Sequence, residues 1–247
     1  MTTVAVAGGT GTVGRPVVAR LQALGHDARV LSRAEGVDLV AGPGVDLRGV
    51  DAVIDVSNVT TLSARRSTAF FETATRTLLD AGRRDGVRHH VALSIVGIEA
   101  APGGYYAGKL AQERAVRAGS VPWSILRATQ FHEFAAQTVR QTAIGPVVLV
   151  PRMRTQPVST RELAVALVDL ALGDPVGDDG ELAGPREERL ADMVRAYVGA
   201  TRRGGRVLEV PFPGRFGRAM ARGELLPDPG ARLGRQTFTE WLEHPDT

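Results

Sequence analysis

Tyr105 and Lys109 are two residues whose types and spacing can do proton chemistry. They lie four positions apart in "YYAGKLAQERAVRAG" (105–119), so on a helix both side chains share one face. A phenol has a pKa of about 10 and is a poor acid at neutral pH. An ammonium group beside it would lower that pKa and let the phenol transfer a proton. Lys109 is the only lysine among the 30 basic residues of the chain.

Ser94 is a third candidate for the same chemistry. It lies near the end of the apolar segment 89–97, eleven residues before Tyr105, and could hold a substrate carbonyl. Three alternatives stay open. Tyr105 could instead cover a pocket while Lys109 holds a cofactor. Tyr106 would replace Tyr105 if the helix were rotated by one residue. Ser94 could cap the end of a strand.

The segment "GGTGTVG" (8–14) places four glycines between an apolar and an amphipathic run. Its glycines fit G-x-G-x-x-G and G-x-x-G-x-x-G, two spacings typical of a dinucleotide-binding loop. At the start of a helix, backbone N–H groups face a pyrophosphate, and the missing Cβ atoms let it approach closely. We therefore expect a nucleotide to contact this loop, at the residues Gly8, Thr10, Gly11, Thr12, Val13 and Gly14.

The residues Ser32 and Arg33 indicate which nucleotide is bound. They stand at the end of the second apolar run, where sites that prefer NAD usually carry an acidic residue for the ribose 2′-hydroxyl. An arginine can instead grip a 2′-phosphate with two hydrogen bonds. The sequence therefore predicts NADP(H), although Glu35 follows closely and an ordinary surface arginine is the alternative.

The elements that must position these residues alternate between strands and helices. Short β-branched runs predict strands, and apolar residues at helical spacing predict the helices between them. We expect strands at 2–8, 28–32, 50–57, 89–97 and 123–128, and helices at 14–25, 66–86, 105–119 and 131–143. This order predicts an α/β fold, a Rossmann-type doubly wound parallel sheet covered on both faces.

The chain after Pro146 shows a looser pattern of short strands and helices, including helices at 159–172 and 189–203. We expect residues 1–145 to form an NADP-binding Rossmann domain. Residues 146–247 then form a smaller α+β substrate-binding region that packs on this domain and does not fold independently.

The composition excludes several classes of function. The chain has no cysteine, so disulfides and thiolate nucleophiles are absent, and no spacing of His, Asp and Glu suggests a metal site. The net charge is only +3 and the arginines are scattered, which argues against a nucleic-acid partner. No apolar run is long enough to span a membrane and no secretion signal is visible, so we expect a cytoplasmic protein.

Several motifs together resemble a known family. In order they are "AGGTGTVG", "LSR", "ALSIVG", "YYAGKLAQE", "ILRATQF" and "QPVSTRELAVALVDLA", and the resemblance extends over nearly the whole chain. They are similar to the NmrA-like, atypical short-chain dehydrogenase/reductase family. The resemblance implies a Ser–Tyr–Lys constellation at Ser94, Tyr105 and Lys109, with Lys109 also bonded to the nicotinamide ribose.

The same resemblance implies further contacts with the cofactor. It places Asp46, Ser57 and Asn58 at the adenine and ribose, although Asp46 could equally be a turn residue. Phe131 and His132, which follow the fifth predicted strand, could face the nicotinamide or the substrate. We read His132 as a capping or surface residue rather than a proton donor.

The function expected from the sequence is an NADPH-dependent reductase with a small-molecule substrate. It would transfer hydride to a quinone, enone or ketone, with Tyr105 as the acid and Lys109 as its activator. One alternative is a redox sensor that binds NADP without turning it over, and another is a non-redox biosynthetic enzyme. We expect a monomer or a homodimer.

Overall fold

The computed structural model describes residues 1–42, 44–202 and 204–244. Its chain forms two compact units. The first contains residues 1–98, 102–127 and 160–180, and the second contains 99–101, 128–159 and 181–247.

The first unit is built on parallel strands. In chain order its elements are β1 (Thr3–Ala7), α1 (Gly14–Ala23), β2 (Asp27–Leu31), η1 (Arg33–Glu35), β3 (Ala52–Asp55), α2 (Ala64–Asp85), β4 (His89–Ile95), α3 (Tyr105–Ala118), β5 (Trp123–Ala128), α5 (Thr160–Leu172) and the start of β9 (Gly177–Ala183). The sheet has the order β12-β9-β5-β4-β3-β1-β2, where β12 (Arg232–Leu233) pairs with the end of β9 in the second unit.

The chain reverses its direction of winding at β1. Ala7 at the end of β1 pairs in parallel with Leu31 of β2 on one side and with Asp55 of β3 on the other. In doubly wound sheets, ligands bind beyond the carboxyl ends of the strands at such a switch point. The Rossmann-type fold expected from the sequence is confirmed, and the segments that follow β1, β2 and β3 emerge together at this edge.

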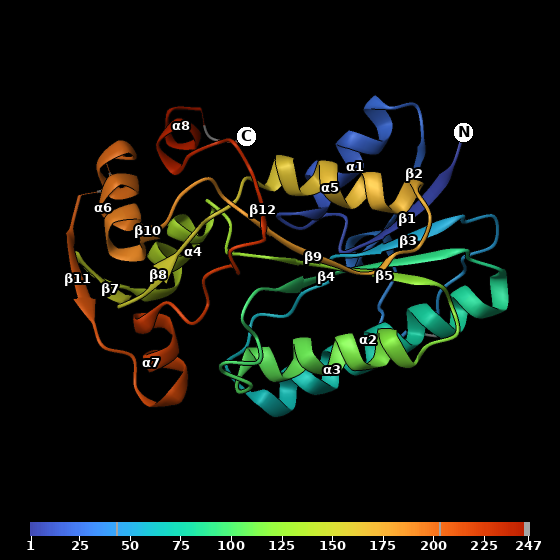
Figure 1. Ribbon diagram of the computed structural model, residues 1–247, viewed down its shortest axis with the longest axis horizontal. Coiled ribbons are helices and arrows are strands. Elements are labelled where there is room, and N and C mark those ends of the chain that lie inside the picture. The colour runs from blue at the N-terminus through green and yellow to red at the C-terminus, as the bar shows by residue number, and fades with distance from the viewer. Residues whose placement is uncertain (43, 203, 245–247) are drawn as a thin grey trace. The chain divides into compact units, whose positions relative to one another are not determined.

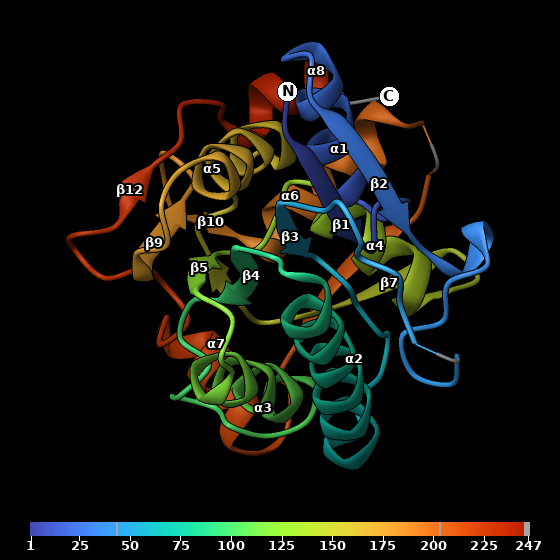
Figure 2. The same ribbon diagram turned by 90° about the vertical axis from the view of Figure 1, so that its right-hand side faces the viewer.

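Two helices cover each face of this sheet. α1 and α5 lie on one face and pack against each other, while α2 and α3 lie on the opposite face (Figures 1 and 2). α2 and α3 approach closely at Gly108, where a Cβ atom would overlap the backbone of Ser67. The Oγ of Ser67 also donates to the carbonyl of Tyr105 at 2.7 Å, which ties the start of α3 to α2.

The second unit contains the remaining elements. They are α4 (Phe134–Thr142), β6 (Ala143–Ile144), β7 (Val147–Pro151), β8 (Arg154–Thr155), β10 (Glu188–Arg189), α6 (Leu190–Ala200), β11 (Arg206–Val210), α7 (Gly214–Arg222), β12 and α8 (Phe238–Glu243). β11, β7 and β6 form a three-stranded sheet, and β10 pairs with β8. The helix predicted at 189–203 corresponds to α6, which ends at Ala200. The last residue of the predicted helix, Arg203, lies outside the described residues.

The division of the chain differs from the boundary expected at residue 145. Residues 128–145 belong to the second unit, whereas Thr160–Gly180 return to the first. The reason is that α5 packs on α1 and on strands β3 and β4, so it completes one face of the sheet. β3 is also shorter than the predicted strand 50–57, because the N–H of Ser57 donates to the Asp55 carboxylate and leaves the strand ladder.

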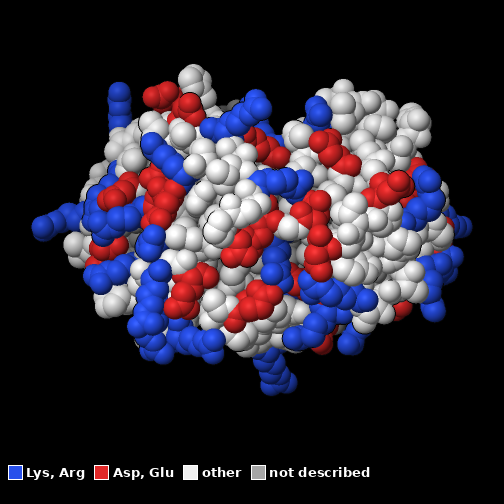
Figure 3. All heavy atoms as spheres, in the orientation of Figure 1, with Lys and Arg blue, Asp and Glu red and all other residues white. Residues whose placement is uncertain are grey.

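Charged side chains of both signs are interspersed on the face shown in Figure 3. Several arginines form ion pairs with nearby carboxylates, among them Arg88 with Asp51 at 2.8 Å and Arg154 with Glu187 at 2.6 Å. A basic stripe of the kind that tracks a nucleic-acid backbone is not visible on this face.

Candidate functional site

The glycine segment forms a tight loop between β1 and α1. Gly8 has φ of +81°, and a Cβ atom there would lie 2.8 Å from the carbonyl oxygen of Val56. A Cβ atom on Gly14 would overlap the carbonyl of Gly8, so the start of α1 sits directly on the loop. Gly8 and Gly14 therefore permit close packing of the backbone, which side chains would prevent.

The outer surface of this loop is free to receive a ligand. Thr10, Gly11 and Thr12 are exposed, and Val13 occupies the N-cap position of α1. No side chain caps this helix, and among its first residues Arg15 donates its N–H to the carbonyl of Gly11 at 3.1 Å while Pro16 has no N–H. Such a helix start favours an anion, and a pyrophosphate matches it in charge and size.

Two shielded hydroxyl groups lie on the segments next to the loop. The Oγ atoms of Ser32, after β2, and Ser57, after β3, have no hydrogen-bond partner within the described part of the chain. Buried polar atoms are normally paired, so these two hydroxyls are available to a ligand at the carboxyl edge of the strands. Together with the glycine loop, these hydroxyls fit the ribose and phosphate groups of a nicotinamide dinucleotide.

Arg33 directly follows Ser32 and is exposed at the start of η1. Its guanidinium forms no hydrogen bond or ion pair with any residue that the structure describes. The pKa of Asp38 is lowered by hydrogen bonds from the N–H groups of Ala41 and Val40, with a smaller contribution from the charge of Arg33. Arg33 thus keeps its donors available at the carboxyl edge of β2.

Tyr105 is bonded to Asn58 on the segment that follows β3. Its hydroxyl donates to Asn58 Oδ1 at 2.7 Å, and the same oxygen accepts the N–H of Val59 at 2.7 Å. Burial raises the pKa of Tyr105 above its usual value, and Tyr106 and Asp55 add to this effect. Lys109, which is expected from the sequence to lower this pKa, is not among the groups that shift it in this structure.

Lys109 is buried and its ammonium group bonds elsewhere. Nζ donates to the carbonyl of Leu93 at 2.6 Å and to Gln112 Oε1, and it lies 4.6 Å from the centre of the Phe71 ring. Burial lowers the pKa of Lys109 to about 8, although Asp55 and Glu113 favour the charged form. In this structure the lysine bonds to β4 and to Gln112, whereas the Tyr105 hydroxyl bonds to Asn58.

Ser94 is not brought to Tyr105. Its buried hydroxyl lies beside Glu113, about 12 Å along α3 from Tyr105 at 1.5 Å per residue. Burial opposes ionisation of Glu113, but Arg127, Ser94 and Arg117 outweigh this effect and lower its pKa. The Ser–Tyr–Lys constellation implied by the family resemblance is therefore not assembled.

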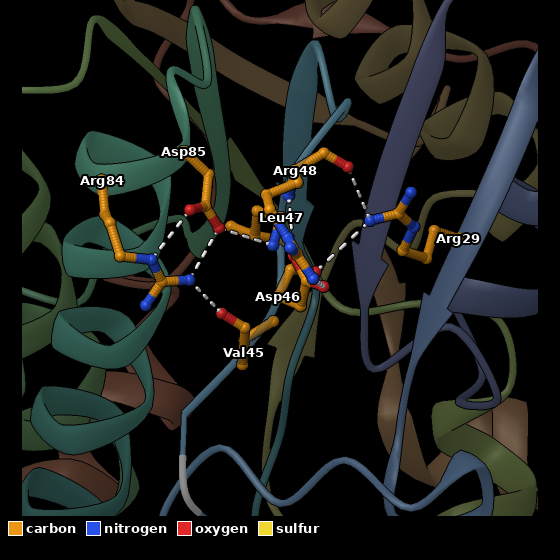
Figure 4. Close-up of polar contacts among 7 residues, drawn as sticks. All are labelled: Arg29, Val45, Asp46, Leu47, Arg48, Arg84 and Asp85. Atoms are coloured by element: carbon orange, nitrogen blue, oxygen red, sulfur yellow. Dashed lines mark hydrogen bonds and ion pairs between the residues drawn. The ribbon is translucent and has the colours of Figure 1, made fainter.

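Asp46 is placed by the structure in a turn. Its carboxylate forms an ion pair with Arg48 at 2.6 Å and accepts the N–H of Arg48 at 3.0 Å (Figure 4). The side chain of Arg48 chiefly lowers the pKa of Asp46. The next residue, Leu47, donates its N–H to Asp85 at the end of α2, which leads to the amino end of β4. The expected adenine contact is not supported, because Asp46 lies toward the edge opposite the glycine loop.

Phe131 and His132 belong to the second unit. Phe131 is half-buried and forms a parallel bridge with Val158. His132 is fully buried, its Nε2 lies 3.1 Å from the carbonyl of Gln236, and its ring is tilted against those of Phe238 and Trp241 at 5.9 and 5.8 Å between centres. His132 is therefore a buried core residue and not the capping or surface residue expected from the sequence, and burial lowers its pKa to about 4.

Two residues near the glycine loop are missing from the expected site. Asp55 is completely buried at the end of β3, and Gln112 is buried on α3 and donates to it at 2.8 Å. The signal was visible as a charged residue inside the apolar run "AVIDVS" and as an amide three residues after the only lysine. Carboxylates are seldom fully buried without partners, so a carboxylate inside an apolar run indicates a specific buried partner such as Gln112.

Comparison with known proteins shows the family to which the chain belongs. The model of the family described as NAD(P)H-binding matches residues 8–172. No curated protein matches the sequence.

Solved structures resemble the fold over most of the chain. The NADPH-dependent quinone oxidoreductase QOR2 from Escherichia coli, complexed with NADPH, gives a TM-score of 0.71 at 16% identity, covering 98% of this chain and 99% of that chain. A short-chain dehydrogenase/reductase superfamily protein from Agrobacterium tumefaciens with bound NAD gives 0.65 at 20% identity, covering 98% and 95%. A nucleoside-diphosphate-sugar epimerase from Staphylococcus aureus gives 0.67 at 12% identity, covering 99% and 100%. At these identities the likeness concerns the fold alone.

No cluster of three or more His, Asp or Glu side chains in the described ranges is placed to hold a metal ion. None of the helices seen there combines the length and apolar character that a bilayer span requires.

Proposed function

This chain belongs to the NAD(P)H-binding family, and from that premise we propose that it is an NADPH-dependent reductase. It transfers hydride to a small or aromatic electrophile, with quinones, enones and ketones as the acceptor classes. The nicotinamide supplies the hydride when bound, and the protein supplies the binding surface and a proton donor.

The observation that carries the choice of NADPH is the position of Arg33. It is exposed at the carboxyl edge of β2, next to the shielded Ser32 hydroxyl, and it forms no ion pair in the described ranges. Its guanidinium can bind a 2′-phosphate with two charge-assisted hydrogen bonds. The loop residues from Thr10 to Gly14 would hold the pyrophosphate, and Ser57 would bond to a ribose or phosphate group.

Tyr105 is the proton donor in this proposal. Its hydroxyl carries a proton at physiological pH, and burial, which raises its pKa, keeps it in this form while making it a weaker acid. A neutral phenol can donate a proton to the oxygen of a reduced ketone but cannot act as a phenolate base. Asn58 holds this hydroxyl beside the segment that follows β3. Lys109 and Ser94, which face the interior, have no direct part in this chemistry.

Quinones are the acceptor class that needs Tyr105 least. A quinone that accepts hydride becomes a hydroquinone anion, which solvent can protonate. The similarity in fold to QOR2, which by its name is a quinone oxidoreductase, makes quinones the first compounds to assay.

The test is NADPH oxidation by the wild type, Tyr105→Phe and Tyr106→Phe against quinones, enones and ketones. We expect Tyr105→Phe to lose ketone turnover by about 100-fold, because general acid catalysis typically contributes that much. Turnover of quinones should fall by less than about threefold, because the substitution leaves the hydride step intact. Tyr106→Phe is the matched control, and equal losses in both variants would contradict the role of Tyr105.

A second candidate function is binding of NADPH without turnover. It is favoured by the hydroxyl of Tyr105, which is bonded to Asn58 and has a raised pKa, so the site contains no activated acid. Tight NADPH binding with no oxidation by any acceptor would identify a sensor. A bound cofactor that is not consumed while a substrate changes would identify a non-redox enzyme.

A further inference from the structure

Three buried side chains connect α3 to the end of β3. Lys109 Nζ donates to Gln112 Oε1, Gln112 Nε2 donates to Asp55 Oδ2 at 2.8 Å, and Asp55 Oδ1 accepts the N–H of Ser57 at 3.0 Å. The exposed fractions are 0% for Asp55, 1% for Gln112 and 4% for Lys109. Each link is shielded from water, so a lost partner cannot be replaced by solvent.

The donor and acceptor types of these side chains determine the direction of each hydrogen bond in the series. An ammonium group only donates, so it must meet the oxygen of the Gln112 amide and not its nitrogen. The amide nitrogen is then turned to Asp55, which must accept. Both Asp55 oxygens accept, Oδ2 from Gln112 and Oδ1 from the N–H of Ser57.

This series of hydrogen bonds ends at Ser57, whose backbone packs against the glycine loop. A Cβ atom on Gly8 would lie 2.8 Å from the carbonyl oxygen of Val56 and 3.0 Å from Cα of Ser57. A shift of a few tenths of an ångström in this segment would therefore press on the loop or open it. The unpaired Ser57 hydroxyl lies on the same segment.

We propose that Asp55 and Gln112 are positioning residues for the cofactor. They hold the segment at Ser57 against the glycine loop in the geometry that NADPH requires. Lys109 acts through them, by fixing the orientation of the Gln112 amide, and not by contact with Tyr105. This inference rests on the binding of NADPH in the proposed function, but not on any turnover.

The test exchanges the carboxylate and the amide. Asp55→Asn turns an amide nitrogen toward Gln112 or Ser57, so one donor faces another, and we expect the Kd for NADPH to rise by about tenfold or more. Adding Gln112→Glu restores each pair, because the introduced carboxylate accepts from both Lys109 and the introduced amide. The double variant should bind NADPH within about threefold of the wild type.

The control is Glu113→Gln, the same change on the next residue of α3. Glu113 is equally buried but bonds to Arg127 and Arg117. The Glu113→Gln variant should have a lower thermal midpoint than the wild type but the same Kd for NADPH. Binding is measured by titration without an acceptor, beside thermal unfolding of each variant.

Two outcomes would overturn the inference. One is an Asp55→Asn variant that binds NADPH as tightly as the wild type. The other is a folded double variant that binds as weakly as Asp55→Asn alone. A wild type that binds NADPH but reduces no acceptor would contradict the proposed reductase and leave this inference standing.

Discussion

The Phe71 ring contacts Tyr105 and Lys109, which lie one helical turn apart on α3 but bond to different groups. The rings of Tyr105 and Phe71 lie 5.6 Å apart between centres, and Lys109 Nζ lies 4.6 Å from the centre of Phe71. The phenol bonds to Asn58 after β3, whereas the ammonium bonds to the carbonyl of Leu93 in β4. Burial therefore acts on each group by itself, raising the pKa of Tyr105 and lowering that of Lys109.

The lowered pKa of Lys109 predicts that stability rises with pH from about 8 to 10. Burial lowers this pKa from 10.5 to about 8, so between these values the unfolded chain binds a proton that the folded chain does not. Above about pH 10 the raised pKa of Tyr105 acts in the opposite direction. The free energy of unfolding should rise by about 2 kcal/mol across the window, at 1.36 kcal/mol per pH unit.

Urea unfolding of the wild type and of Lys109→Met at several pH values checks this prediction. The variant should lack the rise, whatever its stability at neutral pH. Equal slopes in the two proteins would contradict the assignment of the titration to Lys109.

Arg33→Ala should weaken the binding of NADPH and leave that of NADH unchanged. Charge-assisted hydrogen bonds contribute about 1.5–3 kcal/mol, so the Kd for NADPH should rise roughly 10- to 100-fold. Titration calorimetry with both coenzymes measures the difference. Arg48→Ala, which removes an exposed arginine paired with Asp46, should change neither Kd. A similar loss for NADH and NADPH would show that Arg33 does not recognise the 2′-phosphate.

The bond between Tyr105 and Asn58 should be measurable in a double-mutant cycle. Tyr105→Phe and Asn58→Ala each remove one partner of a 2.7 Å hydrogen bond. We expect a coupling of about 0.5–1.5 kcal/mol in the free energy of unfolding, obtained from denaturant curves of the four proteins. Losses that simply add would mean that this bond does not persist in solution.

Gly14→Ala should be destabilising although alanine is the better helix former. A Cβ atom there would overlap the carbonyl of Gly8 and come within 2.6 Å of Cα of Gly9. Overpacking of this kind costs about 1–3 kcal/mol, which exceeds the gain in helix propensity of about 1 kcal/mol. Gly103→Ala is the control, because its Cβ would meet nothing within 4 Å. Thermal unfolding distinguishes them, and a stabilised Gly14→Ala variant would contradict the packing of loop on helix.

The main elements of the first unit could be predicted because their signals are local. The patterns of β-branched strands, amphipathic helices and the glycine segment can each be recognised within about ten residues. α5 was the exception to the expected boundary, since only packing on α1 shows that it returns to the first unit.

The site could be predicted only where it depends on the loop. The placements of Ser94 and Lys109 depend on how α3 is rotated above β4, and spacing along the chain does not carry that rotation. The position of Asp46 depends on the path of the segment between β2 and β3. Leu47 is buried in the core there, and Asp46 beside it forms an ion pair with Arg48. Long-range packing decided both.

The burial of the only lysine makes the protein its own reporter of local opening. An amine-reactive reagent cannot reach Nζ of Lys109 while α2 and α3 remain packed over it. The rate at which this side chain becomes labelled therefore measures how often that layer opens. Since the sequence has no other lysine, the competing amine is the α-amino group of the chain, and peptide analysis separates a label there from one on Lys109.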